Sequence, residues 1–288
     1  MNLKAFADKY QLVNWFKGTI FLLLGVLNSR FDVGFNWFVD NLIFGAIIYF
    51  LLVVSGMLLA LYLKLPKENA GKKFDKTEMI KFISAGLYLA AYGFSAIVVF
   101  YFARNIMLLI ALAIIGIIWA ISFLYGDIWE EKSIIINLII AIMVSFGLLF
   151  GALINDLSIP VFVYFFFLGA FTLQLSKDLL KSCKKKVKIR ETTEEYKLLA
   201  EILTVKKSQT IILVLQGLTI LFLVIPYFTG LYNYFLYLIP MLIATILIVI
   251  SAIFNYIYDF ETEYMGRVFI LMRSGMFCLI VAYFFASI

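Results

Sequence analysis

The chain has 288 residues, of which 64% are hydrophobic, 18% aromatic and 15% charged, with a net charge of +6 and no histidine. A water-soluble core of this size cannot hide so much apolar surface, so the composition excludes a soluble enzyme and predicts an integral membrane protein. The absence of histidine excludes hydrolytic triads, haem ligation and histidine-based zinc sites, so any bound metal would need oxygen ligands.

Apolar runs of transmembrane length predict an all-α polytopic membrane protein with nine transmembrane helices. The first and sixth runs are short, so helices there should extend into the flanking polar residues. In chain order the predicted spans are Val13–Leu27, Leu42–Leu63, Met79–Phe102, Ile106–Tyr125, Ile134–Ile154, Pro160–Leu175, Thr210–Leu231, Tyr234–Tyr258 and Val268–Ile288.

Basic residues are distributed very unevenly over this nine-span arrangement. Of the 24 Lys and Arg residues, 21 fall on the side of the amino terminus and of the loops after spans two, four, six and eight. Because translocation disfavours Lys and Arg, we expect the amino terminus to be cytoplasmic in the cell membrane. Most of the charge lies in two predicted cytoplasmic loops, 64–78 and 176–209, so it does not indicate a nucleic-acid partner. We expect these loops to form a cap over a cavity in a single transmembrane domain, 1–288.

Both loops contain signals for the start of a helix. Asp75, three residues before Glu78, predicts the start of the third span, and Thr192, three before Glu195, predicts a short segment. One apolar stripe on that segment predicts a separate helix lying in the membrane interface; the stripe consists of Tyr196, Leu199, Ala200 and Leu203.

Short polar sequences occur at the ends of three predicted spans: Asn14 in the first, Asn137 in the fifth and Leu-Ser-Lys-Asp-Leu-Leu-Lys at 175–181 in the sixth. Together with the number of spans and the two long loops, they resemble the UbiA superfamily of intramembrane prenyltransferases. Asn14 stands where that family has the asparagine of its first helix. Asn137 in Ile-Asn-Leu-Ile-Ile-Ala is similar to the family's G-N-x-x-V-A, although Ile136 replaces the glycine. Residues 175–181, Leu-Ser-Lys-Asp-Leu-Leu-Lys, are similar to its R-E-I-x-K, while 203–208 and 273–276 resemble the segments before its seventh helix and in its last. The resemblance implies a UbiA-like bundle, a prenyl diphosphate donor and transfer of the prenyl group to an acceptor.

The resemblance also implies two aspartate-rich motifs that hold Mg²⁺ ions on the diphosphate, and here the sequence departs from the family. With the first motif anchored on Gly56, its N-D pair falls on Ala60 and Leu61, its next aspartate on Lys64 and its last on Glu68. Three of its four ligand positions therefore carry no carboxylate or amide oxygen.

The second motif is lost in a similar way. Anchoring it on Lys181 places Ser182 and Lys185 at its two aspartates, while Asp178 stands at the glutamate of R-E-I-x-K. Only Glu68 and Asp178 remain as candidate metal ligands. Mg²⁺ is thus the cofactor that the resemblance implies, but the residues support it weakly, because two carboxylates with lysines beside them hold two Mg²⁺ ions poorly.

Lysines stand where the family has aspartates, and two interpretations remain open. A helical extension of the sixth span would carry one lysine face, made of Lys177, Lys181, Lys184, Lys185 and Lys188. These side chains either bind a phosphate or diphosphate headgroup directly or touch anionic lipid headgroups as ordinary cytoplasmic lysines, at about 1 kcal/mol each. On the first interpretation, the phosphate-binding candidates are Asn14, Lys64, Asn137, Lys177, Lys181 and Lys185.

A few further residues within the spans have both a functional and a structural interpretation. Arg273 is functional, snorkels to the interface, or pairs with an acidic residue of the preceding loop, which contains Asp259, Glu261 and Glu263. The side chains of Gln174, Gln216 and Asn255 either line an interior or bond between helices. Gly147 and Gly151 predict close helix packing.

Three functions remain open at this stage. The first is an active prenyltransferase with a divergent site. The second is a catalytically inactive homologue that binds a phospho-lipid or a partner subunit. The third is a lipid or solute transporter. Membrane lipids and a prenyl diphosphate are the expected partners, and the sequence indicates no particular protein partner or catalytic residue.

Overall fold

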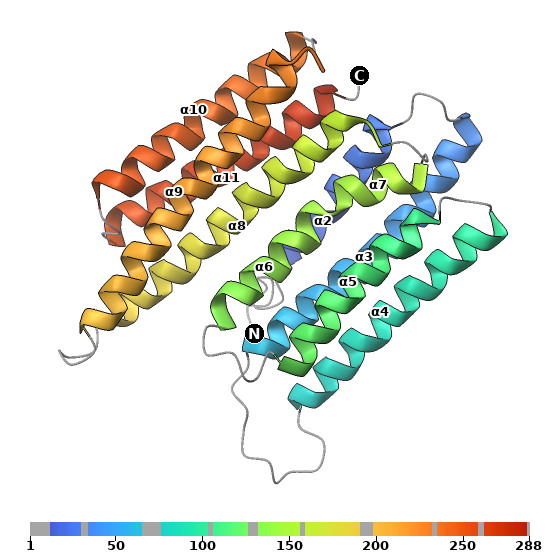
Figure 1. The fold of residues 1–288 in the computed structure, drawn as a ribbon, viewed down its shortest axis with the longest axis horizontal. Coiled ribbons are helices and arrows are strands. Elements are labelled where there is room, and N and C mark those ends of the chain that lie inside the picture. Colours follow the sequence, from blue (N-terminus) through green and yellow to red (C-terminus); the bar gives the residue numbers. More distant parts are fainter. Residues whose placement is uncertain are drawn as a thin grey trace. The chain divides into compact units, whose positions relative to one another are not determined.

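The computed structural model describes residues 12–29, 34–64, 76–102, 106–125, 132–155, 159–190, 198–231, 235–258 and 262–286. Within these ranges all the regular structure is α-helical (Figure 1). The helices are α2 (Leu12–Asn28), α3 (Phe35–Lys64), α4 (Lys76–Tyr101), α5 (Met107–Tyr125), α6 (Lys132–Ser145), α7 (Gly147–Asn155), α8 (Val161–Arg190), α9 (Leu198–Phe228), α10 (Phe235–Ile257) and α11 (Thr262–Ala286). The chain forms two compact units, Met1–Val163 and Tyr164–Ile288.

The predicted all-α membrane architecture is confirmed. Seven helical stretches in the described part are long and apolar enough to cross a membrane, and two apolar helices, Val13–Asn28 and Met107–Ser122, are shorter. Each of the nine predicted spans coincides with helical structure, the fifth with α6 and α7 together. The chain is therefore a multi-pass membrane protein, whereas nine crossings and their sidedness remain predictions.

The helix boundaries confirm two expectations and correct a third. Helix α8 continues beyond the apolar run to Arg190, as expected for the short sixth span, and α4 begins at Lys76, directly after the predicted cap. The prediction of a separate interfacial helix is wrong where the structure describes the chain, because Leu198–Leu203 form the first turns of the continuous helix α9, whereas Tyr196 lies outside the described residues. No Gly or Pro occurs between Leu198 and Gln216, so no residue in that stretch stops the helix from propagating.

In the first unit, α2 and α7 pack with their backbones in contact, which confirms the role predicted for Gly147 and Gly151. A Cβ atom added to Gly147 would lie 2.6 Å from the carbonyl oxygen of Gly18 and 2.7 Å from the nitrogen of Leu22. A Cβ on Gly151 would collide with the Leu22 oxygen and lie 2.7 Å from the nitrogen of Val26. Only residues without a side chain allow this approach, as in small-residue contacts between membrane helices.

The fifth predicted span is divided at Phe146, and Tyr49 of α3 accounts for the break. The buried Tyr49 hydroxyl donates to the carbonyl oxygen of Met143 at 2.7 Å and accepts the backbone N–H of Gly147. Those two backbone groups would bond to each other in an uninterrupted helix. A side chain inserted into the backbone ladder is a recognised cause of a local helix break.

Polar side chains join the other helices of this unit. Ser55 of α3 and Ser84 of α4 are fully buried, and each hydroxyl donates to the other residue's carbonyl oxygen at 2.7 Å. At the end of α7, the Asn155 amide donates to the carbonyl oxygens of Val26 and Ser29, and Asn41 donates to its Oδ1 at 2.9 Å. The Asn155 amide thus ties α7 to the carbonyl end of α2, where the Val26 oxygen also accepts from the backbone N–H of Ser29 at 3.4 Å.

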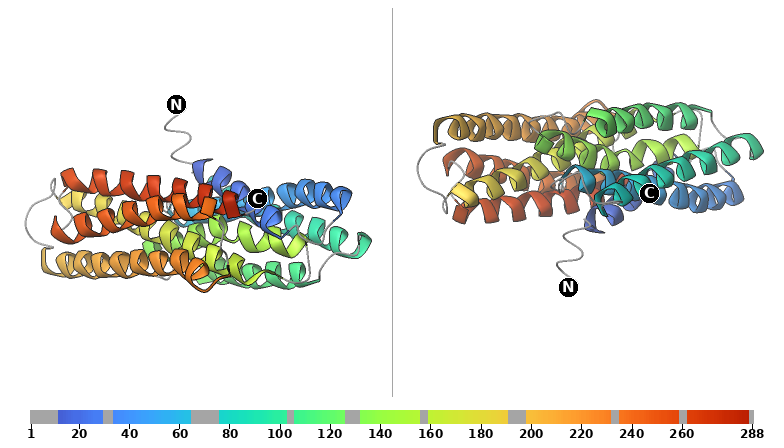
Figure 2. Two further views of the ribbon diagram at one scale, coloured as in Figure 1. Left: turned by 90° about the horizontal axis from the view of Figure 1, so that it is seen from above. Right: turned by 90° about the horizontal axis from the view of Figure 1, so that it is seen from below.

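In the second unit, α10 packs against α9 and α11, and side-chain hydrogen bonds join α8 to α9 and to α11. Helices α10 and α11 run side by side along much of their length (Figures 1 and 2). Buried hydrogen bonds join the helices: Thr172 with Thr219 at 2.8 Å, Gln216 to Ser251 at 2.9 Å, Tyr237 to the Leu223 oxygen at 2.8 Å and Tyr283 to the Phe166 oxygen at 2.8 Å. The polar groups inside the unit are thus largely used to hold helices together.

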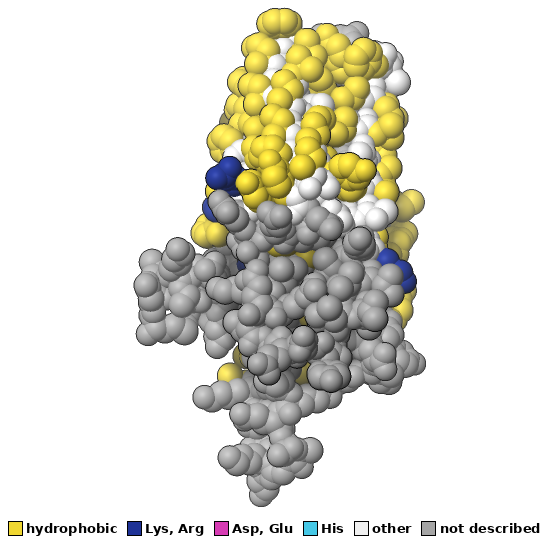
Figure 3. All heavy atoms as spheres, turned by 90° about the vertical axis from the view of Figure 1, so that its left-hand side faces the viewer, with side chains coloured by type: hydrophobic (Ala, Val, Ile, Leu, Met, Phe, Trp, Pro, Cys, Tyr) yellow, Lys and Arg dark blue, Asp and Glu magenta, His cyan; other side chains and the backbone are white. Residues whose placement is uncertain are grey.

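The outward faces of the helices are apolar. Figure 3 shows one face on which hydrophobic side chains cover the described helices, with a few Lys or Arg side chains at the edge of that apolar surface. On α9 and α10 the exposed side chains include Ile211, Val214, Leu221, Ile239 and Ile246. Lipid tails suit such faces, whereas water does not.

Candidate functional site

A buried cluster of polar side chains that contains a charge pair lies on α8, where its apolar stretch Val161–Cys183 approaches the polar extension. Gln174, Lys177 and Asp178 occur at i, i+3 and i+4, so helix geometry alone places their side chains together. All three are buried: Gln174 is 0% exposed, Lys177 4% and Asp178 8%. A buried charge pair is costly unless its members neutralise each other, so this arrangement needs an explanation.

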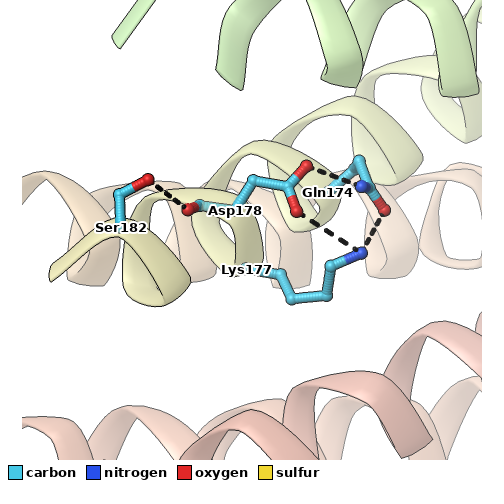
Figure 4. A network of polar contacts seen from close by, with 4 residues as sticks. All are labelled: Gln174, Lys177, Asp178 and Ser182. Carbon is cyan, nitrogen blue, oxygen red and sulfur yellow. Dashed lines mark hydrogen bonds and ion pairs between the residues drawn. The ribbon is translucent and has the colours of Figure 1, made fainter. Parts of the chain in front are cut away.

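The three side chains form one closed set of contacts (Figure 4). The Gln174 Nε2 group donates to Asp178 Oδ2 at 2.7 Å, and the Lys177 ammonium donates to Gln174 Oε1 at 2.5 Å. Lys177 Nζ lies 3.9 Å from Asp178 Oδ1, which makes an ion pair but no direct hydrogen bond. Ser182 donates to the backbone oxygen of Asp178 and takes no part in the charge pair. The cluster carries no net charge.

The lysine face of α8 changes its environment between two successive turns. Lys177 is buried and already paired, whereas Lys181 is exposed. Lys185 lies in α8 and Lys64 ends α3, but their side chains are outside the described part of the chain. Two phosphate-binding candidates on α8 have described side chains, Lys177 and Lys181, and Lys181 is the one whose charge is accessible.

The remaining candidates are in the first unit or outside the described residues. Asn14 is half-buried in α2 and Asn137 is buried in α6. Glu68 lies outside the described residues.

The described side chains do not fit the two-Mg²⁺ site that the resemblance implies. Nowhere among them do three His, Cys, Asp or Glu side chains come together. Asp178 is the one described candidate ligand, and its carboxylate already bonds to Gln174 and pairs with Lys177. The neighbouring ammonium would repel a divalent cation. The described side chains therefore do not offer the ligands that a conventional site for two Mg²⁺ ions needs.

Of the other polar residues singled out in the sequence, Gln216 donates to Ser251 on the neighbouring helix, as the structural interpretation predicted. Asn255 contacts Gln209 through its backbone oxygen, which accepts the hydrogen bond, so the role of its buried side chain stays a prediction. Arg273 is exposed on α11, which favours the snorkelling interpretation. The sequence interpretation did not link Gln174 to the charge pair, although the i, i+3, i+4 spacing was a usable signal.

Long apolar helices with lipid-facing surfaces and a buried polar cluster at the end of an apolar stretch define a polytopic helical membrane protein. No protein-family model matches the chain, and no curated protein is similar to it in sequence. A solved structure from work on the biosynthesis of digeranylgeranylglyceryl phosphate synthase in membranes is similar, with a TM-score of 0.70 and 19% identity. The match covers 99% of this chain and 98% of that one. It supports the UbiA-like fold, and at this identity it shows the fold alone.

Proposed function

We propose that the chain is a UbiA-like membrane protein of the prenyltransferase type that handles an isoprenoid phosphate or diphosphate lipid. The observation that carries this proposal is the likeness in fold to a digeranylgeranylglyceryl phosphate synthase over 99% of the chain. The proposal includes nine crossings, a cytoplasmic amino terminus, and loops 64–78 and 176–209 as a cytoplasmic cap over the single domain 1–288.

In this proposal lysines, rather than metal-bound carboxylates, hold the phosphate end. Lys181 is exposed on the polar extension of α8, and Lys64 and Lys185 are proposed to act with it. Asn14 and Asn137 are proposed to donate hydrogen bonds to the same group. An ammonium is a compact charge that binds phosphate without a metal ion. Lys177 differs from these residues, because its charge is balanced by Asp178.

A second candidate is a catalytically inactive homologue that binds such a lipid without turning it over. The specific observation in its favour is the pairing of Asp178 with Lys177, which occupies a carboxylate otherwise open to a metal ion. The two candidates share the lipid and differ in product formation.

Binding of tritiated geranylgeranyl diphosphate to the purified protein in phosphatidylcholine nanodiscs tests the proposal. We expect saturable binding that survives EDTA and weakens by about tenfold or more in Lys181→Glu/Lys185→Glu, because two phosphate contacts are reversed in charge. Arg267→Glu/Arg273→Glu is the matched control, since both arginines are exposed on α11 and the variant reverses the same number of charges.

The outcomes separate the alternatives. Absence of binding with and without Mg²⁺ refutes the proposed function, and binding that requires Mg²⁺ refutes the metal-independent site. With binding established, a labelled prenyl product from a panel of alcohol and aromatic acceptors identifies the active enzyme, and its absence across the panel identifies the inactive homologue.

A further inference from the structure

We draw no further inference here: the strongest candidate, the buried side-chain atoms without a hydrogen-bond partner that Ser176, Gln216 and Asn255 contribute from α8, α9 and α10, carries nothing, because the described residues show neither a contact among these three atoms nor a cavity beside them that would indicate a ligand.

Discussion

The contact between α2 and α7 makes a quantitative prediction for Gly151→Ala. The added Cβ would lie 2.7 Å from the nitrogen of Val26 and 3.0 Å from the carbonyl carbon of Gly25, and it would collide with the Leu22 oxygen. Ordinary contact begins at 3.4 Å. To restore ordinary contact with the Val26 nitrogen alone, α2 and α7 would have to move apart by 3.4 − 2.7 = 0.7 Å. Because the obstacle is backbone, no rotamer change relieves it.

Overpacking of this kind costs about 1–3 kcal/mol, and we expect a value in the upper part of that range. Alanine also raises helix propensity by about 1 kcal/mol over glycine, which would mask part of the loss. Gly93→Ala is the matched control, since Gly93 lies within α4 and a Cβ there would meet nothing within 4 Å. The propensity gain is common to both variants, so their difference isolates the steric term.

The assay is reversible unfolding in mixed micelles of increasing dodecyl sulfate content, followed by far-UV circular dichroism. We expect Gly151→Ala to be less stable than Gly93→Ala by about 1–3 kcal/mol. A difference within about 0.5 kcal/mol, the range of an ordinary surface substitution, would refute backbone contact between the two helices.

Two further predictions use the same unfolding assay. Tyr49→Phe keeps the ring but removes the hydroxyl that bridges α6 and α7, so we expect a loss of about 1–3 kcal/mol from the unsatisfied backbone groups, and unchanged stability would contradict the bridge. For Ser55→Ala and Ser84→Ala, a double-mutant cycle should give a coupling energy of about 0.5–3 kcal/mol, because each hydroxyl donates to the other residue. Additive effects would argue against this reciprocal pair.

The helices could be predicted well from the sequence because apolar length is a local property. Runs such as 79–102 and 234–258 are long enough to show a helix without any knowledge of their neighbours. The break at Phe146 could not be predicted, because it depends on Tyr49 from a different helix. The continuation of α9 from Leu198 has another reason: a capping signal and an amphipathic stripe indicate where a helix starts and which face is apolar, but not where it ends.

The candidate site, too, could be predicted only in part from the sequence. Contacts among Gln174, Lys177 and Asp178 follow from their spacing on one helix, and the sequence contains that information. Burial does not follow from spacing: Lys177 and Lys181 are one turn apart on the same side of α8, yet one is buried and the other exposed. Burial depends on what packs against each position of α8, which is a property of the tertiary structure: Leu180 and Cys183, beside and beyond the exposed Lys181, are buried.

The hydrogen bonds of Asn155 have a consequence for the order in which the first unit assembles. Its amide satisfies the carbonyls of Val26 and Ser29, which lie 129 and 126 residues earlier in the chain. During synthesis, α2 leaves the ribosome long before Asn155 exists, so these two carbonyls lack the Asn155 amide in the meantime, although the Val26 oxygen can already accept from the backbone N–H of Ser29. The helix α2 therefore cannot take up its final hydrogen bonds until α7 has been made and has packed against it.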